Sequence, residues 1–406
     1  MIHNYHDVHI AVFSQYHTNP DCPATSRHYT LLAYIARTHR VTLITTRTWE
    51  QQQLTNEFAW VPKGVELRAA QVPYQNQMGV LRRGLAFGQY AAYALREGLR
   101  IDKPDVIWGI STPLTAAWAA AQVARWRQVP WVFEVQDLWP SFPIAMGAVP
   151  NRLAQRGLFA LEKSLYQSAS HVLPLSPDMT QYVRELGVPT DKLTTVLNGT
   201  DLNLAARATN EAVAALRQEV GLAGRQVILY AGTFGRANNM AMLVEAAVQL
   251  AATCPSVTWL FMGHGFDEKL LQQAAAQHAF IRLVPPQPRH AVFTWFRLAD
   301  VSVVSFLGLP VLDANSPAKL YDSLAVGTPV VVTNTGWTRH LVETTGCGWY
   351  SPASDASSLA ALLENLFQHP EKLRAAGAAG KALAASTFDR QQLANVVQQV
   401  LEKAVK

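Results

Sequence analysis

The chain has 406 residues, 49% of them apolar, so it can bury the cores of two or three domains. Its formal net charge of +5 is too small an excess to indicate a protein that binds nucleic acid. The three cysteines, Cys22, Cys254 and Cys347, are too scattered for a disulfide framework or a zinc knuckle. Because there is no run of about 18 apolar residues and no signal-peptide pattern, we expect a cytoplasmic protein.

In the first half of the chain, short apolar strands alternate with helical stretches, which predicts a mostly parallel, doubly wound sheet. The strand candidates are residues 8–13, 41–46, 105–110, 131–135, 171–176 and 194–197. A long polar loop follows the first of them. It contains His17 and leads to Ser26 and Arg27 at the start of the next helix, where an anion could bind. A solvated arginine is the alternative interpretation.

Residues 81–100 are an apolar and aromatic helix candidate with arginines near both ends, at positions 82, 83, 96 and 100. Such a helix is typical of contact with an anionic membrane surface. An ordinary surface helix that packs on its own domain explains the same pattern.

The strand at 131–135 runs directly into the segment QDLWP at 136–140. Asp137 therefore lies where a strand ends, and Trp139 follows it. A carboxylate there could act as a general base or bind the hydroxyl of an acceptor, and a turn-capping role is the alternative.

The pattern of strands and helices restarts at residue 226, after a hinge-like segment near 198–220. The strands expected in this second sheet are 227–232, 257–263, 281–284, 301–306 and 328–333, and residues 354–406 suit two or three terminal helices. Two domains of this kind leave a cleft, with ligand-binding residues just after the strands.

Two glycine turns follow strands of the second sheet. Gly232, Thr233, Gly235 and Arg236 form the first, in which glycines let the backbone approach a phosphate and the arginine can bind its oxygens. The second contains Gly263 and His264. A glycine turn that merely ends a strand is the simpler interpretation of each.

Residues 315–336 are the most informative segment. Ser316 is a typical N-cap, Pro317 suits the first helical position, and Leu320 belongs to an apolar face. Lys319 in the first turn, beside free amide groups, suits a diphosphate. Asp322, about one turn on, could accept hydrogen bonds from the hydroxyls of a sugar. A capped core helix with two surface charges is the alternative.

In this order the motifs resemble those of the family-4 retaining glycosyltransferases of the GT-B fold, especially the bacterial branch that builds cell-surface polysaccharides. The resemblance covers almost the whole chain. It depends on ATSR (24–27), QDLWP (136–140), LEKSLYQSASHVLPLS (161–176), NGTD (198–201), YAGTFGR (230–236), MGHG (262–265) and SPAKLYDSLAVGTPVV (316–331).

The resemblance implies two Rossmann-like domains facing a cleft: an acceptor-binding domain at 1–200 and a donor-binding domain at 201–387. A final helix at 388–406 should pack back on the first domain. The implied catalytic residues are Asp137, Arg236 and Lys319. The implied donor-binding residues are Gly232, Thr233, Gly235, Arg236, Gly263, His264, Lys319, Leu320 and Asp322, with Arg236 and Lys319 on the diphosphate and Asp322 on the ribose. The acceptor candidates are His17, Ser26, Arg27 and Trp139.

The resemblance further implies transfer of a hexose-type sugar, with retention and without a metal or cofactor, from a UDP-linked donor to a glycan or lipid-linked glycan. We expect a cytoplasmic enzyme, with peripheral contact to the anionic inner membrane as a hypothesis, and no nucleic-acid partner. The alternatives are a non-catalytic protein of the same fold that binds nucleotide sugars and a nucleotide-sugar 2-epimerase.

The chain departs from the family pattern at three positions. Many members carry two glutamates eight positions apart, but here the second is Asp322 and Ala314 occupies the first. Gln136 stands where many members have histidine, and His264 where an acidic residue is common. The missing carboxylate disfavours a carboxylate nucleophile at that position and favours attack from the face of the leaving group.

Overall fold

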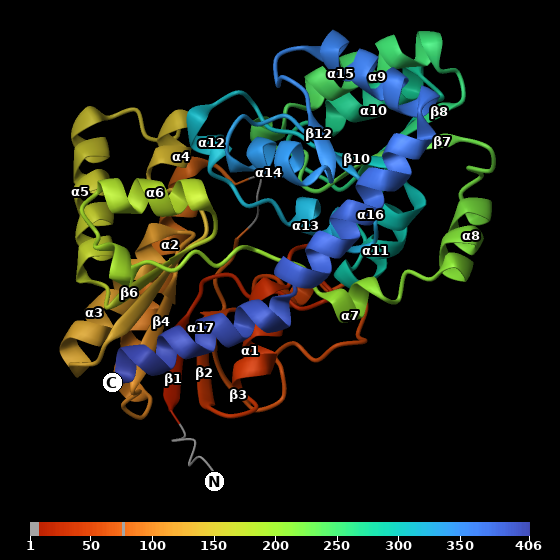
Figure 1. The fold of residues 1–406 in the computed structure, drawn as a ribbon. Coiled ribbons are helices and arrows are strands. Elements are labelled where there is room, and N and C mark those ends of the chain that lie inside the picture. Colours follow the sequence, from red (N-terminus) through yellow and green to blue (C-terminus); the bar gives the residue numbers. More distant parts are fainter. Residues whose placement is uncertain (1–7, 75–77) are drawn as a thin grey trace.

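Two six-stranded parallel sheets follow one another along the chain in the computed structural model, which describes residues 8–74 and 78–406 (Figure 1). The first sheet has the order β3-β2-β1-β4-β5-β6. Its strands are β1 (His9–Phe13), β2 (Arg40–Thr46), β3 (Val65–Ala70), β4 (Val106–Ile110), β5 (Trp131–Val135) and β6 (His171–Pro174).

Helices cover both faces of this first sheet. On one face lie α2 (Val80–Arg100), α3 (Leu114–Arg127), α5 (Arg152–Ser168) and α6 (Pro177–Glu185). On the other face lies α1 (Arg27–Ile35). The short α4 (Ser141–Ala145) follows β5, and the single turns η1 (Glu50–Gln52) and η2 (Thr190–Lys192) lie in connecting segments. The amphipathic segment predicted at 81–100 is confirmed as α2.

The second sheet has the order β12-β11-β10-β7-β8-β9. Its strands are β7 (Gln226–Ala231), β8 (Val257–Met262), β9 (Ile281–Val284), β10 (Val301–Val304), β11 (Val330–Val332) and β12 (Gly348–Tyr350). One face packs on α9 (Met240–Thr253), α10 (Glu268–Gln277) and α15 (Ala356–Gln368). The other packs on α7 (Leu202–Ala205), α11 (Arg289–Leu298), α13 (Ala318–Ala325) and α16 (Pro370–Thr387).

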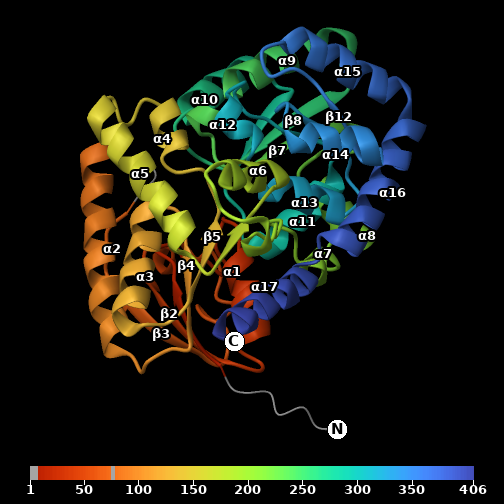
Figure 2. The same cartoon turned by 60° about the vertical axis from the view of Figure 1, so that its left-hand side comes forward.

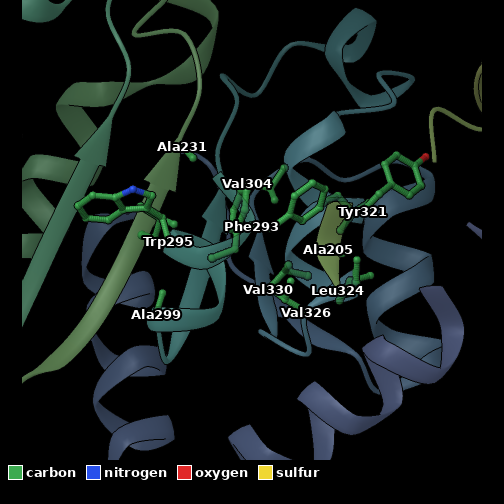
Figure 3. Close-up of a cluster of buried hydrophobic side chains, with 14 of the residues drawn as sticks. Ala205, Ala231, Phe293, Trp295, Ala299, Val304, Tyr321, Leu324, Val326 and Val330 are labelled. Atoms are coloured by element: carbon green, nitrogen blue, oxygen red, sulfur yellow. The ribbon is translucent and has the colours of Figure 1, made fainter. Parts of the chain in front are cut away.

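The remaining elements of the second half are α8 (Asn210–Glu219), η3 (Arg236–Asn238), α12 (Pro310–Asp313) and α14 (Trp337–Thr345). Figure 3 shows how α11 and α13 fill the core below the sheet: Phe293 and Leu324 lie against Val304 and Val330 of the strands. Because Leu320 and Leu324 are fully buried, α13 is fixed by its apolar face. Lys319 in its first turn lies beside Gly232, just after β7, which places that turn at the carboxyl edge of the sheet.

The last helix, α17 (Arg390–Val405), leaves the second half and lies along α1 on the first sheet, as Figures 1 and 2 both show. Its buried residues Val397 and Leu401 join the same apolar cluster as Leu32 and Ile35 of α1. The chain therefore crosses between the halves twice, once at about residue 200 and once before residue 390.

The structure confirms two doubly wound parallel sheets and corrects three details of the predicted elements. Residues 194–197 are not a strand, although Thr194 and Val196 donate backbone hydrogen bonds to the segment containing β6. The edge strands β3 and β12 were not predicted. Helix α13 begins at Ala318, after Pro317, and Ser316 does not cap it, since its hydroxyl lies 2.6 Å from the hydroxyl of Tyr321.

Candidate functional site

The loops after the strands of the two sheets contact one another directly. After β9, the amide of Arg289 donates to the carbonyl oxygen of Cys22 in the loop after β1, at 3.2 Å. After β11, the amide of Trp337 donates to the carboxylate of Asp178 in α6, at 2.9 Å. The carboxyl ends of the two sheets therefore face each other, which is where open α/β sheets bind ligands.

Lys319 is the most unusual charged group of this region. Its ammonium nitrogen lies 3.8 Å from the centre of the Tyr230 ring, and the described residues supply no carboxylate for it. Burial lowers the pKa of Lys319 to about 7. Burying an ammonium group without a counter-charge costs free energy, and an anion bound beside the group would offset that cost. This is the arrangement expected of a diphosphate site.

Because Gly232 has no side chain, the Lys319 ammonium group can lie close to its backbone. Its φ is +138°, and a Cβ atom added there would lie 3.0 Å from the ammonium nitrogen of Lys319. Tyr230, whose ring faces the ammonium, is fixed because its hydroxyl donates to the carbonyl oxygen of Thr233 at 2.8 Å. The first predicted glycine turn and the predicted lysine are therefore in direct contact, although they are 87 positions apart.

The second glycine turn has a different use from the one expected. A Cβ atom on Gly263 would lie 2.0 Å from the carbonyl oxygen of Gly232, and one on Gly265 would lie 2.6 Å from that of Phe234. The backbone of His264 also accepts a hydrogen bond from the amide of Phe234 at 2.9 Å. These glycines let the two loops pack against each other, which fixes the position of Gly232 beside Lys319.

Arg236 and Phe266 extend from these two loops toward solvent. The guanidinium of Arg236 lies 3.9 Å from the centre of the Phe266 ring, and that ring is 62% exposed. Arg236 is thus held by a cation–π contact, and its charge also acts on the carboxyl group of Asp267. Thr233 is exposed and Gly235 is half-buried in the same turn. The loop can therefore offer a second cation to a ligand held by Lys319.

Two residues predicted to bind the donor point into the protein instead. The Leu320 side chain is fully buried in the core of the second half, so only its backbone can face a ligand. Asp322 is also fully buried, where it pairs with Arg289 and accepts a hydrogen bond from Thr200 at 2.9 Å. Oδ1 is therefore used within the protein, whereas Oδ2 has no hydrogen-bond partner among the described residues, and the ribose contact stays a prediction.

The position that lacks the family's first carboxylate is part of the contact between the two halves. Ala314 is buried against the apolar cluster of the first sheet, and its carbonyl oxygen accepts from the hydroxyl of Ser176 at 2.5 Å. Asp313 does not replace the missing group. Its two carboxylate oxygens accept from the amide and the hydroxyl of Thr335, each at 2.8 Å.

In the first half, Asp137 lies at the carboxyl end of β5 as predicted. Burial raises the pKa of its carboxyl group, while a hydrogen bond from the hydroxyl of Thr112 at 3.2 Å opposes that rise. A carboxyl group with a raised pKa at a sheet edge can take up a proton during a reaction. Trp139, two residues later, is half-buried, and its ring lies edge-on to Phe87 at 5.8 Å.

The three candidates from the loop after β1 are structural. His17 is fully buried, its Nε2 lies 2.8 Å from the carbonyl oxygen of Trp60, and burial lowers its pKa to about 4. Ser26 is also fully buried. Arg27 is 1% exposed and donates to Glu134 and to the carbonyl oxygen of Leu197, at 3.1 and 2.6 Å. None of the three is placed to meet an acceptor.

A buried charged cluster at the hinge was missed by the sequence patterns. Beside Arg27 it contains Glu134, Arg289 and Arg390, all at most 6% exposed. Burial alone would raise the pKa of Glu134, but Arg27 and His28 bring it down to about 2. Arg390 donates to the carbonyl oxygen of Asn198 at 3.2 Å. Arginines outside any motif gave no signal, because their partners are distant in the sequence.

Two models of protein families match the chain. One is described as a glycosyl transferase 4-like domain and covers residues 23–199, and the other as glycosyl transferases group 1 and covers residues 225–369. Together they cover every strand of the two sheets except β1, and they leave the hinge and the helices α16 and α17 outside.

The chain is also similar to several curated bacterial proteins. It is 28% identical to a D-inositol 3-phosphate glycosyltransferase of Thermobispora bispora, over 53% of this chain and 52% of that protein. It is 25% identical to a glycogen synthase of Mycobacterium tuberculosis, over 84% and 80% of the two chains. The colanic acid biosynthesis glycosyltransferase WcaL of Salmonella typhimurium, described as putative, is 26% identical over 50% and 48%. The chain thus spans about half the length of two of these three relatives.

Solved structures share the fold over nearly the whole chain. Anabaena HepE in complex with UDP-glucose superposes with a TM-score of 0.70 at 17% identity, over 98% of this chain and 100% of that one. WaaG, a glycosyltransferase involved in lipopolysaccharide biosynthesis, superposes with a TM-score of 0.71 at 15% identity, over 97% and 99%. At these identities the likeness shows a common architecture.

Proposed function

Because this chain belongs to the family-4 glycosyltransferases of the GT-B fold, we propose that it transfers a hexose-type sugar from a UDP-linked donor to a hydroxyl group of a glycan or lipid-linked glycan in bacterial surface polysaccharide synthesis. The observation that carries the proposal is the enclosed ammonium of Lys319, placed beside Gly232 without a counter-charge. A nucleoside diphosphate supplies the charge that this group lacks. HepE, which has the same fold, binds UDP and UDP-glucose.

The reaction needs stabilisation of the leaving diphosphate. As the glycosyl–phosphate bond breaks, negative charge gathers on the phosphate oxygens, and Lys319 with the first amides of α13 would stabilise it. Arg236 lies on the adjoining loop as a second cation. We propose that these protein groups stabilise the leaving diphosphate in a mechanism in which no metal takes part.

We propose that transfer occurs with retention of the anomeric configuration. The family resemblance supports retention, and the local residues bear only on its route: Ala314 offers no carboxylate and both oxygens of Asp313 are bonded to Thr335, which disfavours a covalent intermediate at this position. The acceptor hydroxyl then attacks from the face that the diphosphate leaves, and a departing phosphate oxygen takes its proton. Asp137 is the protein group best placed to assist on the acceptor side.

The proposal is tested by replacing Lys319 and measuring donor binding and turnover separately. A thermal-shift screen of UDP, GDP and ADP sugars should show stabilisation of the wild type by one nucleotide class, because a ligand of the folded state raises the melting temperature. Lys319→Ala should lose that shift and about 10²–10³-fold in kcat/KM, the usual effect of removing one group that stabilises developing charge. Lys372→Ala, a change at an exposed lysine of α16, is the matched control.

The same experiment separates the alternatives. Near-normal kcat/KM in both Lys319→Ala and Arg236→Ala would contradict the proposed glycosyltransferase site. Release of free sugar isomers without an acceptor would indicate a 2-epimerase. Donor binding without transfer or hydrolysis, across a panel of acceptors, would indicate a non-catalytic protein. The anomeric configuration of the first product, read by NMR, and turnover in excess chelator test retention and metal independence.

We also propose that the enzyme is cytoplasmic and meets an anionic membrane through the start of α2. Leu81 and Leu85 are 86% and 68% exposed there, next to Arg82. Exposed leucines beside arginine suit the interface of an anionic bilayer. In the described part of the chain, no helix is long and apolar enough to cross a membrane.

Vesicle flotation tests this contact. The wild type should float with vesicles that contain phosphatidylglycerol, and a Leu81→Ser, Leu85→Ser double variant should not. Leu153→Ser, a change at a 74% exposed leucine of α5, is the control for a single exposed leucine elsewhere on the same half. Equal recovery of the wild type and the double variant would count against the proposal.

A further inference from the structure

Four aromatic side chains form a continuous row along the carboxyl edge of the first sheet. The ring centres of Tyr16 and Tyr74 are 4.8 Å apart, those of Tyr74 and Phe87 are 6.2 Å apart, and those of Phe87 and Trp139 are 5.8 Å apart. The rings come from four places in the chain: the loops after β1, β3 and β5, and the second turn of α2. We call these four residues the aromatic row.

Burial distinguishes the aromatic row from the aromatic core of the same domain. Phe13 and Phe133, within the strands, are fully buried, whereas all four members of the row are half-buried. Trp139 packs partly against the apolar core of this domain, and the row as a whole keeps part of its surface open at the edge of the sheet. It is the kind of surface that binds a flat, partly apolar ligand.

Polar groups adjoin the aromatic row. The side-chain amide nitrogen of Gln15 lies 3.4 Å from the hydroxyl oxygen of Tyr16. Gln15 is only 1% exposed, yet its carbonyl oxygen Oε1 has no hydrogen-bond partner in the described part of the chain. A buried polar atom normally has a hydrogen-bond partner, and a ligand with a hydroxyl donor would supply the one that Oε1 lacks. The charge of Arg83 also acts on the hydroxyl of Tyr16.

The aromatic row connects two features already described. At one end, Trp139 lies two positions after Asp137 in the same loop. Its neighbour in the row, Phe87, comes from α2, the helix whose start is proposed to face the membrane, and Tyr16 at the other end comes from the loop after β1. A ligand that lies along the row therefore extends from the loop after β1, past α2, to the loop that carries the proposed acceptor carboxylate.

We propose that the aromatic row binds a pyranose ring of the acceptor, an inference that rests on the proposed glycosyl transfer. A pyranose presents C–H bonds on one face, which pack on aromatic rings, and hydroxyl groups at its rim, which need polar partners. Gln15 and the hydroxyls of Tyr16 and Tyr74 supply such partners. An aliphatic chain in the same place would leave the Gln15 oxygen unpaired, at a cost in free energy.

Saturation-transfer difference NMR on the full chain tests this assignment. The probes are the methyl β-pyranosides of glucose, galactose and N-acetylglucosamine, and farnesyl phosphate as the lipid alternative. We expect at least one pyranoside to receive saturation mainly at H1, H3 and H5, the protons of one ring face. Phe87→Leu keeps an apolar side chain but removes the ring, and it should reduce this signal several-fold.

Two controls make the outcome decisive. Trp126→Leu removes a 55% exposed aromatic ring from the last turn of α3, at the other edge of the sheet, and should leave the signal unchanged. The thermal shift caused by UDP-glucose, measured on the same samples, reports the proposed function independently of the acceptor. No pyranoside signal, a signal equal in the wild type and Phe87→Leu, or binding of farnesyl phosphate alone would overturn the assignment.

Discussion

At the scale of single residues, Lys319 couples the proposed donor site to pH. Burial lowers its pKa from the usual value near 10.5 to about 7, so a large share of the free enzyme carries a neutral lysine at pH 8. A bound diphosphate favours the charged form and raises that pKa again. Donor binding should therefore take up a proton, and donor affinity should fall as pH rises above about 7.

Isothermal titration calorimetry checks this prediction. UDP-glucose is titrated into the wild type and Lys319→Met between pH 6.5 and 9, in two buffers of different ionisation enthalpy. The wild type should show proton uptake and an affinity that weakens as the lysine loses its charge. Lys319→Met should bind weakly at every pH with no proton uptake. A wild-type affinity that is flat across this range would contradict the pKa assigned to Lys319.

The stability of the free protein should respond to pH in the opposite direction. In the unfolded chain Lys319 has its ordinary pKa, so between about pH 7 and 10 the unfolded state binds more protons at this position than the folded state does. This residue alone therefore makes the folded state more stable as pH rises through that window. A free energy of unfolding that rises with pH in this window indicates that charged Lys319 destabilises the fold, as expected of a residue that serves ligand binding.

The sequence could place Lys319 and Asp322 about one helical turn apart, but it could not show the partners of the Asp322 carboxylate, and the reason is physical. Both lie in one short helix, and local pattern gives their spacing along it. Whether a carboxylate faces a ligand depends on partners that arrive from elsewhere, here Arg289 and Thr200, which are 33 and 122 positions away. The same holds for Arg27, because its partner Glu134 is 107 positions away.

At the scale of elements, the two glycine turns act as one unit. A methyl group on Gly263 would meet the carbonyl oxygen of Gly232 at 2.0 Å, and backbone cannot yield as a flexible side chain can. The φ of +142° at Gly263 is also strained for any other residue. We predict that Gly263→Ala displaces the loop around Gly232, destabilises the second domain by several kcal/mol and abolishes the donor-induced thermal shift.

Gly84→Ala provides the matched control for this change. Gly84 lies inside α2, where a Cβ atom would meet nothing within 4 Å. Since alanine has the higher helix propensity, this variant should be stabilised by up to about 1 kcal/mol and keep its donor response. Chemical denaturation and the thermal shift measure both effects. A Gly263→Ala protein with normal stability and normal donor response would show that the loops can separate.

The two strands that were not predicted from sequence, β3 and β12, both lie at an edge of their sheet, although the opposite edge strands β6 and β9 were predicted. Central strands such as β1 and β8 are buried on both faces, so they appear as continuous apolar runs. The edge strand β3 is only half-buried and has the mixed sequence VELRAA, and β12 has three residues. Residues 194–197 have strand-like composition, but they lead into the hinge and share only a few hydrogen bonds with their neighbours.

At the scale of the whole molecule, the two chain crossings are bonded to each other. The amide of Thr200 donates to the carbonyl oxygen of Phe388 at 2.8 Å, and the amide of Arg390 donates back to Thr200 at 3.0 Å. Gly199 allows this approach, because a Cβ atom there would lie 2.7 Å from the carbonyl oxygen of Phe388. Motion of one half relative to the other must therefore bend both crossings together, and α17 anchors the second crossing to the first sheet.

The anchoring of α17 can be measured with two changes on the same helix. Leu401 is fully buried between α17 and the first sheet, so Leu401→Ala should cost roughly 2–5 kcal/mol of unfolding free energy. Val405, four positions later, is 39% exposed, and Val405→Ala should change stability by less than about 0.5 kcal/mol.

Scanning calorimetry with and without UDP-glucose then shows which domain the Leu401→Ala change destabilises. Because the proposed donor site lies in the second domain, the ligand should still raise the melting temperature of Leu401→Ala, while the transition of the first domain moves down. Equal melting temperatures for the two variants would mean that α17 rests on the first sheet without holding it.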